Sequence, residues 1–137
     1  MTSRSDPSRG LLDTSVVIDW DDVEVARALP DEVAISAITV AELAAGPHVT
    51  TNAAEAARRQ LHLQRVESQF EPLPFDAEAA RSYGLVVAAV VAAGRSQGSR
   101  IADLLIAATA HAHGLPLYTR NPDDFASLHG VIQIVAV

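Results

Sequence analysis

The stretch LLDTS (Leu11–Ser15) places an aspartate directly behind a short apolar run. Gly10 to Asp13 predicts a short buried strand, so Asp13 lies at the carboxyl end of that strand. Further acids lie beside apolar runs that we expect to be buried, in SAITVAEL (Ser36–Leu43), RIADLLIAATA (Arg100–Ala110) and TRNPDDF (Thr119–Phe125). Because ligands of open α/β sheets bind beyond the carboxyl ends of the strands, these stretches predict one shared acidic pocket.

Short apolar strands alternate with helices along the chain, which predicts an α/β fold with a parallel sheet covered on both faces. The predicted strands are Gly10–Asp13, Val33–Ser36, Leu115–Thr119 and Val131–Val135, with a short extended piece at Phe70–Pro74. The predicted helices are Ile38–Ala45, Asn52–Ser68, a helix capped by Asp76 that runs to about Ala93, and Ile101–His113, which Gly114 closes, with a helical turn at Pro122–Leu128. Val16–Trp20 is ambiguous, because its β-branched residues favour a strand whereas Ser15 suits a helix cap.

Length and composition indicate one domain with a proper apolar core. The chain has 137 residues, of which 49% are apolar and none is cysteine, so zinc–thiolate sites, disulfides and cysteine nucleophiles are excluded. No apolar run reaches the roughly 20 residues of a membrane span. We expect a cytoplasmic protein with no membrane partner, in which residues 1–9 form a flexible tail and residues 10–137 form the domain.

The net charge of −7 argues on its face against a nucleic-acid partner, since phosphate contacts supply most non-specific affinity. That objection weakens where acids are neutralised by a bound cation. All ten basic residues are arginine, which suits bidentate phosphate contacts.

Each candidate acid also has an ordinary explanation when it is taken alone. Asp13 suits a helix cap, Glu42 a solvated helix face, and Asp103 the favourable N-terminal end of a helix dipole. Asp123 suits a capped turn in the Asn-Pro-Asp series. The four stretches together are harder to explain by chance than any one of them.

Electrostatics indicates what would hold such acids together. Two carboxylates about 5 Å apart repel by roughly 3 kcal/mol at an effective dielectric constant near 20. Several such pairs would consume much of the ~5–15 kcal/mol that stabilises a domain, so a cation or protons must neutralise the cluster. With oxygen ligands and no cysteine, Mg²⁺ or Mn²⁺ fits better than zinc.

The four motifs resemble those of the PIN domain family, and most closely its VapC-type toxin ribonucleases. The resemblance runs from Gly10 to Val135 and rests on LLDTSVVID with Asp13, SAITVAEL with Glu42, ADLLIAATA with Asp103, and TRNPDDF with Asn121 and Asp124. It implies a PIN-like three-layer fold with about five parallel strands, and it makes Ser15–Trp20 helical. It also implies a metal-dependent endoribonuclease, a homodimer, and a VapB-type antitoxin that occupies the active site.

On this hypothesis the acids divide the work of hydrolysing an RNA phosphodiester. Asp13 and Asp103 would hold the principal Mg²⁺ or Mn²⁺, and Glu42 and Asp124 would act on a second metal or through ordered water. Thr14 or Ser15 would fix the Asp13 rotamer. The chain departs from the family pattern at Asn121, where members often carry aspartate, so Asp124 is the candidate for the fourth acid and Asn121 is expected to hold a water or a neighbouring carboxylate.

Other features have two readings each. Arg100 and Arg120 flank the acidic motifs and suit either phosphate contact or surface solubility. Leu85–Ala93 is apolar nearly all round its helix, which fits core burial or a dimer interface. His111 and His113 complement the helix C-terminus rather than form a ligand pair, because residues two apart do not face each other on a helix.

Two further segments combine solvated and packed residues. The acid-rich stretch Asp19–Glu24 is expected to be a solvated connector, with Trp20 packing nearby, and Arg58 and Arg59 to mark the solvated side of their helix. Ala54, Ala57, Leu61 and Val66 are predicted to share the apolar face of that helix.

Rival functions remain open at this point. Asn121, which stands where members of the family often carry aspartate, leaves open a non-catalytic PIN-like module that binds RNA or protein. Cleavage of DNA is a weaker variant of the nuclease hypothesis. A nucleotide-binding domain is disfavoured, because LLDTSVV offers a carboxylate where a phosphate needs backbone amides.

Overall fold

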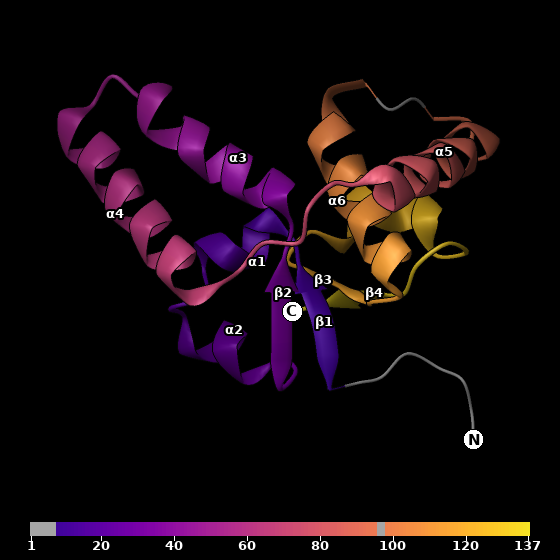
Figure 1. Cartoon of the computed structure of the whole chain (residues 1–137), viewed down its shortest axis with the longest axis horizontal. Helices are drawn as coiled ribbons and strands as arrows, with labels where there is room; N and C mark the ends of the chain where they lie inside the picture. The colour runs from indigo at the N-terminus through magenta and orange to yellow at the C-terminus, as the bar shows by residue number, and fades with distance from the viewer. Residues whose placement is uncertain (1–7, 96–97) are drawn as a thin grey trace.

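The computed structural model describes residues 8–95 and 98–137. Its centre is a parallel sheet with the strand order β2-β1-β3-β4 (Figure 1). The strands are β1 (Arg9–Leu12), β2 (Glu32–Ile35), β3 (Leu117–Thr119) and β4 (Ile134–Ala136). The two central strands, β1 and β3, carry the residues that lead directly into the LLDTS and TRNPDDF motifs.

Helices cover both faces of the sheet. The α-helices are α1 (Thr14–Ile18), α2 (Val23–Arg27), α3 (Ala37–Ala45), α4 (Ala53–Gln69), α5 (Ala77–Ala92) and α6 (Ile101–His113). Short 3₁₀ segments are η1 (Gly46–His48), η2 (Gly98–Arg100) and η3 (Pro122–Leu128). No helix among the described residues is long and apolar enough to cross a membrane.

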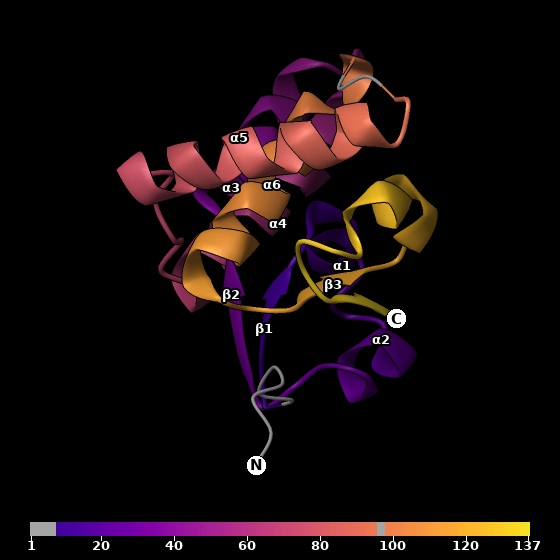
Figure 2. The same cartoon turned by 90° about the vertical axis from the view of Figure 1, so that its right-hand side faces the viewer.

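Two apolar clusters occupy the two sides of the sheet, as the alternation of side chains along β1 requires. Leu11 packs in the cluster with α5, α6 and η3, whereas the next residue, Leu12, packs with α1, α2 and Val66 of α4. Figure 1 shows α5 and α6 together on one side, while α3 and α4 form a separate pair on the other. Figure 2, turned by 90°, shows α5 and α6 from their own side, in front of α3 and α4. The fold is therefore three-layered, as predicted.

Helix starts follow capping chemistry. The side chains of Asp13, Ser36, Asn52 and Asp76 accept hydrogen bonds from backbone amides in the first turns of α1, α3, α4 and α5. At the other end of α6, Gly114 has a φ of 64°, the left-handed conformation that glycine adopts readily. The predicted bounds of α6 and its closure by Gly114 are confirmed.

Among the described residues the sheet has four strands rather than the predicted five or so. The predicted extended piece at Phe70–Pro74 contributes a single isolated bridge, between Leu73 and Ser36, because the prolines around it lack the amide donors that a ladder needs. The last strand begins at Ile134, three residues after its predicted start.

Three local predictions need correction. The strand β1 begins at Arg9, and Glu32 N donates to Ser8 O, so Ser8 and Arg9 belong to the folded domain rather than to the predicted tail, whose residues 1–7 lie outside the described residues. The predicted connector Asp19–Glu24 leads into helix α2, which Asp22 caps. On α4 only Leu63 and Val66 are buried, while Ala54, Ala57 and Leu61 are exposed, because α4 touches the domain with a narrow stripe.

Candidate active site

Asp13 lies where β1 ends and α1 begins, and its side chain is only 4% exposed. Its Oδ1 accepts from Ser15 N at 2.7 Å, and its Oδ2 accepts from Ser15 Oγ at 3.1 Å and from Thr119 Oγ1 at 2.5 Å. Thr119 ends the neighbouring strand β3, so two chain segments hold one carboxylate. The prediction that a hydroxyl fixes Asp13 is confirmed for Ser15, and sequence reasoning missed Thr119.

Glu42 lies on α3 and is exposed, but a hydrogen bond from α1 holds its side chain. Thr14 Oγ1 donates to Glu42 Oε1 at 2.6 Å and lies 2.9 Å from the hydroxyl of the buried Thr39. Thr14 therefore connects the start of α1 to Glu42 rather than to Asp13. Only one carboxylate oxygen of Glu42 is engaged in this contact.

Asp103 lies in the first turn of α6, half-buried. Its pKa is raised from 3.8 to about 6, first by burial and then by the negative charges of Asp13, Asp124 and Glu42, with Arg100 acting in the opposite direction. The four acids from distant parts of the chain therefore act on one another electrostatically. This is the crowding that the placement at the carboxyl ends of the strands predicts.

The fourth motif, in η3, separates its two candidate residues. The carboxylate Oδ1 of Asp124 pairs with Arg100 Nη1 at 2.6 Å and contributes to the charge felt by Asp103. Asn121 is exposed; its backbone amide donates to Thr119 Oγ1 at 2.9 Å, and its side chain makes no hydrogen bond within residues 8–95 and 98–137. The expected contact of Asn121 with a neighbouring carboxylate is thus absent from the described structure.

The four acids are close enough to interact electrostatically, but their side chains are not arranged as a complete set of metal ligands. In the part of the chain that the structure describes, no group of three His, Asp or Glu side chains has an arrangement that could hold a metal ion. Thr14 and Arg100 engage the two outer acids, Glu42 and Asp124. The donors are all carboxylate oxygens, and the negative charges of three of them add to the effect of burial on the pKa of the fourth, Asp103, so the chemistry of the set fits a hard divalent cation.

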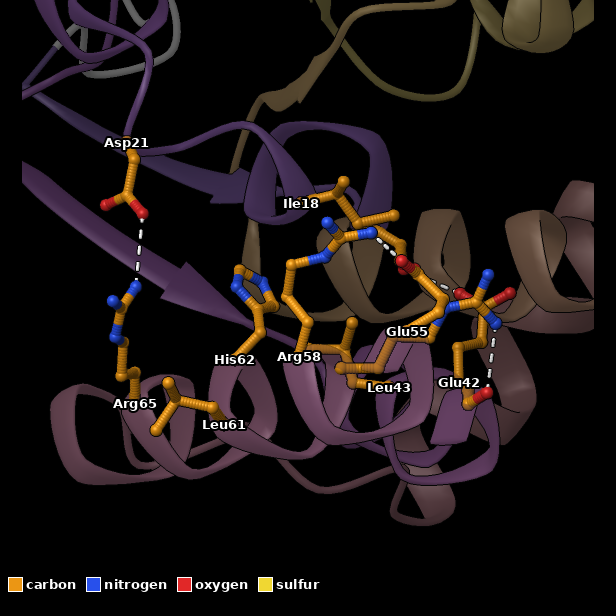
Figure 3. A pocket seen from close by; sticks show the side chains of 12 residues that line it. Ile18, Asp21, Glu42, Leu43, Glu55, Arg58, Leu61, His62 and Arg65 are labelled. Carbon is orange, nitrogen blue, oxygen red and sulfur yellow. Dashed lines mark hydrogen bonds and ion pairs between the residues drawn. The ribbon is translucent and has the colours of Figure 1, made fainter. Parts of the chain in front are cut away.

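A large pocket opens on the Glu42 side of the acids, between α1, α3 and α4 (Figure 3). Its volume is about 670 Å³. Its apolar lining includes Ile18, Leu43 and Leu61, and Figure 3 shows charged side chains around them. The pocket is wide enough for several side chains of a partner molecule.

Ion pairs tie down the arginines of this pocket. Glu55 pairs with Arg58 and, at 2.7 Å, with Arg59, which also donates to Gly46 O at 3.0 Å. Arg65 Nη1 lies 3.3 Å from Asp21 Oδ2. The prediction that Arg58 and Arg59 mark a solvated side was therefore incomplete, because both also line the pocket; the cause is the outward lean of α4, which no local pattern encodes.

Other predicted residues take structural roles. Ser82 Oγ lies 2.7 Å from His111 Nδ1 and joins α5 to α6. Arg120 pairs with Asp19 at 2.8 Å, which ties the residue after β3 to the end of α1. Trp20 packs against Phe70 with ring centroids 5.0 Å apart, as the expected local packing implies.

Fold and site together define a class: a parallel α/β domain whose acids gather at the carboxyl end of the sheet. The PIN domain family model matches residues 10–130. Ribonuclease VapC5 of Mycobacterium tuberculosis is 38% identical over 130 residues, which cover 93% of each chain. Ribonuclease VapC4 of the same organism is 35% identical over 128 residues, which cover 90% of this chain and 93% of the relative.

A solved structure agrees with these sequence matches. The crystal structure of VapBC-5 from Mycobacterium tuberculosis, a member of the VapBC family of toxin-antitoxin systems, matches with a TM-score of 0.83 and 38% identity, covering 96% of this chain and all of that chain. The chain belongs to the PIN domain family and, within it, to the VapC toxin ribonucleases.

Proposed function

We propose that the chain is an endoribonuclease whose activity depends on Mg²⁺ or Mn²⁺, with Asp13 and Asp103 as the principal metal ligands. The observation that carries the proposal is the gathering of carboxylates from four separate segments around the half-buried Asp103, whose pKa is raised first by burial and then by the negative charges of Asp13, Asp124 and Glu42. When bound, the cation supplies Lewis acidity for the phosphoryl oxygen and lowers the pKa of a coordinated water.

The chain's own residues supply position and proton handling. Ser15 and Thr119 hold the Asp13 carboxylate in one rotamer, so its orientation is fixed before substrate arrives. Thr14 occupies one oxygen of Glu42, which leaves the other oxygen to orient the attacking water and accept its proton. Asp124 adds negative charge on the opposite flank, and Asn121, uncharged, is assigned a hydrogen bond to water.

The test is cleavage of total RNA by the purified chain, with the new ends mapped. We expect cleavage with Mn²⁺ or Mg²⁺ and none in excess EDTA. Cleavage that persists in EDTA contradicts the metal dependence. RNA binding without cleavage in either metal favours the alternative, a non-catalytic PIN-like module that binds RNA or protein. An RNA substrate also implies that the chain acts in the cytoplasm.

A VapB-type antitoxin is the second part of the proposal. Support comes from solved relatives that are VapBC complexes, and from the pocket beside Glu42, whose apolar lining suits an amphipathic partner helix. A basic residue of the partner would enter the acidic site and form charge-assisted hydrogen bonds with Asp13, Glu42 and Asp103.

Co-expression tests the partner. Growth arrest by the chain alone, rescue by the product of an adjacent gene, and loss of rescue when the inserted basic residue becomes glutamate are the expected results. If the chain is harmless alone and no neighbouring product copurifies with it, the toxin assignment fails while the nuclease assignment stands.

A homodimer is the remaining part. The side chains of Leu85 and Val91 on α5 are 56% and 59% exposed, although the same helix buries Val86 and Val90 in the core. The apolar segment Leu85–Ala93 thus serves the core on one face and leaves another open. Light scattering of the chain alone should give a dimer mass, and Leu85→Glu should give the monomer mass at equal concentration.

A further inference from the structure

A second, smaller hollow lies on the Asp124 side of the acids, away from the pocket lined by Glu42. Its volume is about 80 Å³. Its lining consists of two arginines, one serine, one acid and two apolar residues: Arg95, Arg100, Ser127, Asp124, Val90 and Leu104. Apart from Asp124, its polar groups are hydrogen-bond donors, which is the lining that an anion requires.

Arg95 distinguishes this hollow from the rest of the surface. Among the described arginines, the side chains of Arg27, Arg81 and Arg95 have no ion pair or hydrogen bond with other described residues, while the others are paired. Of these three, Arg95 alone lines a hollow shared with a candidate active-site acid. Its backbone amide donates to Val90 O at 3.0 Å, so its backbone is fixed after α5 while its guanidinium group has no partner among residues 8–95 and 98–137.

Arg100 can serve the acid and an anion at the same time. Its Nη1 contacts Asp124 Oδ1 at 2.6 Å, and a guanidinium group carries five N–H donors in a rigid fork. The donors that do not face Asp124 remain for another ligand. Ser127 adds a hydroxyl that has no hydrogen bond within residues 8–95 and 98–137.

The size of the hollow selects the part of a nucleic acid that it accepts. With a volume of about 80 Å³, the hollow is much smaller than the pocket beside Glu42, whose volume is about 670 Å³. A phosphate group is small and anionic, so it matches both the size of the hollow and the two guanidinium groups in its lining.

We propose that the hollow between Arg95 and Arg100 binds a backbone phosphate of the RNA next to the phosphate that is cut. The proposal rests on the nuclease function above and adds the path of the RNA over the surface. The RNA passes from the acidic site over η3 toward the end of α5. Arg95 is a binding residue that raises affinity for any RNA sequence, because phosphate contacts carry no base information.

The experiment measures RNA binding in the full chain carrying Asp13→Asn, which removes cleavage from the measurement. The probe is a short fluorescent single-stranded RNA of random sequence, titrated with Mn²⁺ present over a series of salt concentrations. Arg95→Gln should raise the Kd several-fold and should lower the slope of log K against log salt by about 0.7, the value for one phosphate contact on a single strand. Arg95→Lys should recover part of the affinity, since the charge returns without the fork.

Arg81→Gln is the matched control, because Arg81 is also an exposed arginine with no partner among the described residues, and it lies on α5 about three helical turns from the end of the helix. It should leave the Kd and the slope nearly unchanged. Equal effects of Arg81→Gln and Arg95→Gln mean that only overall charge matters, and they overturn the proposal. An unchanged Kd in Arg95→Gln, or weakened binding of a protein partner without weakened RNA binding, overturns it as well.

Two readouts separate this proposal from the nuclease function. In the otherwise unmodified chain, Arg95→Gln should leave the Mn²⁺-induced rise in melting temperature intact and should raise KM for RNA with little change in kcat. Metal-dependent cleavage with an unchanged KM in Arg95→Gln leaves the nuclease standing and removes only the phosphate site.

Discussion

The inner and outer acids of the site are held in different ways. Asp13 is buried at a strand end and is fixed by hydroxyl and amide donors, and Asp103 projects from the first turn of the buried helix α6. Glu42 is exposed and Asp124 is partly buried, and each is engaged through one oxygen, by Thr14 and Arg100. The inner pair is thus placed by the end of β1 and by the buried helix α6, whereas the outer pair depends on side chains that can rearrange when a ligand binds.

The largest effect should follow from neutralising the inner acids. Asp13→Asn and Asp103→Asn should each lower kcat/KM for RNA by more than about 100-fold, because metal-ion catalysis is worth several kcal/mol. Circular dichroism should show the fold unchanged, since asparagine keeps the size of each side chain. Undiminished cleavage by either variant would remove the inner pair from the metal site.

Substitutions in the fourth motif should lower activity less than those of the inner acids, and they should show whether Asp124 or Asn121 matters more. Asp124→Ala should cost about 10- to 100-fold in activity, and Asn121→Ala should cost less, because of these two residues only Asp124 brings negative charge near Asp103. The comparison uses initial rates at saturating Mn²⁺. The reverse ranking would assign the fourth position to Asn121 and would revive the question of whether this chain needs a fourth acid.

Sequence reasoning reached the inner pair more easily than the surroundings of the outer pair. Asp13 and Asp103 follow or begin buried elements, and burial leaves a periodic trace in the sequence. Thr119 was quoted within a motif, but its bond to Asp13 joins residues that are 106 positions apart, and no local pattern encodes such a contact.

The misses share one physical cause, which is that tertiary placement decides the role of a side chain. Arg58 was predicted on the solvated face of α4 and Leu61 on its apolar face. Because of the way α4 is placed against the domain, both residues line the same pocket. Helix α2 has only five residues, which is too few to show a helical periodicity in the sequence, although Asp22 is a normal N-cap. Arg95 carried no signal at all, because an exposed arginine after a glycine is common on any surface.

Metal binding should stabilise the fold through the inner pair. A cation that binds only the folded chain adds RT ln(1 + [L]/Kd), or about 2.7 kcal/mol at a hundredfold excess over Kd. Mn²⁺ should therefore raise the melting temperature, and Asp13→Asn should shrink the rise. An identical melting curve with and without Mn²⁺ would argue against a site that forms in the absence of RNA.

The raised pKa of Asp103 gives a pH dependence with a defined sign. In metal-free protein the folded chain holds this proton more tightly than the unfolded chain, so the free energy of unfolding should fall as pH rises from 3.8 through about 6 and level off above that. Urea unfolding in EDTA measures the fall, and Asp103→Asn should lack that part of it. Adding Mn²⁺ should restore stability above pH 6, where the carboxylate is charged. A wild-type profile that matches the Asp103→Asn profile would contradict the raised pKa of Asp103.

The smallest effects should come from two isosteric changes that remove one hydroxyl from each pair. Thr119→Val takes a donor from a buried carboxylate, and the loss of a hydrogen-bond partner in the interior costs about 1–3 kcal/mol. Thr14→Val takes a donor from Glu42, which water can replace, so the cost should stay below about 1 kcal/mol. Urea midpoints in EDTA provide the measurement, free of any metal contribution. If Thr14→Val is the more damaging change, the outer pair is as firmly built as the inner pair, and rearrangement of Glu42 on binding metal or RNA is no longer a tenable description of the site.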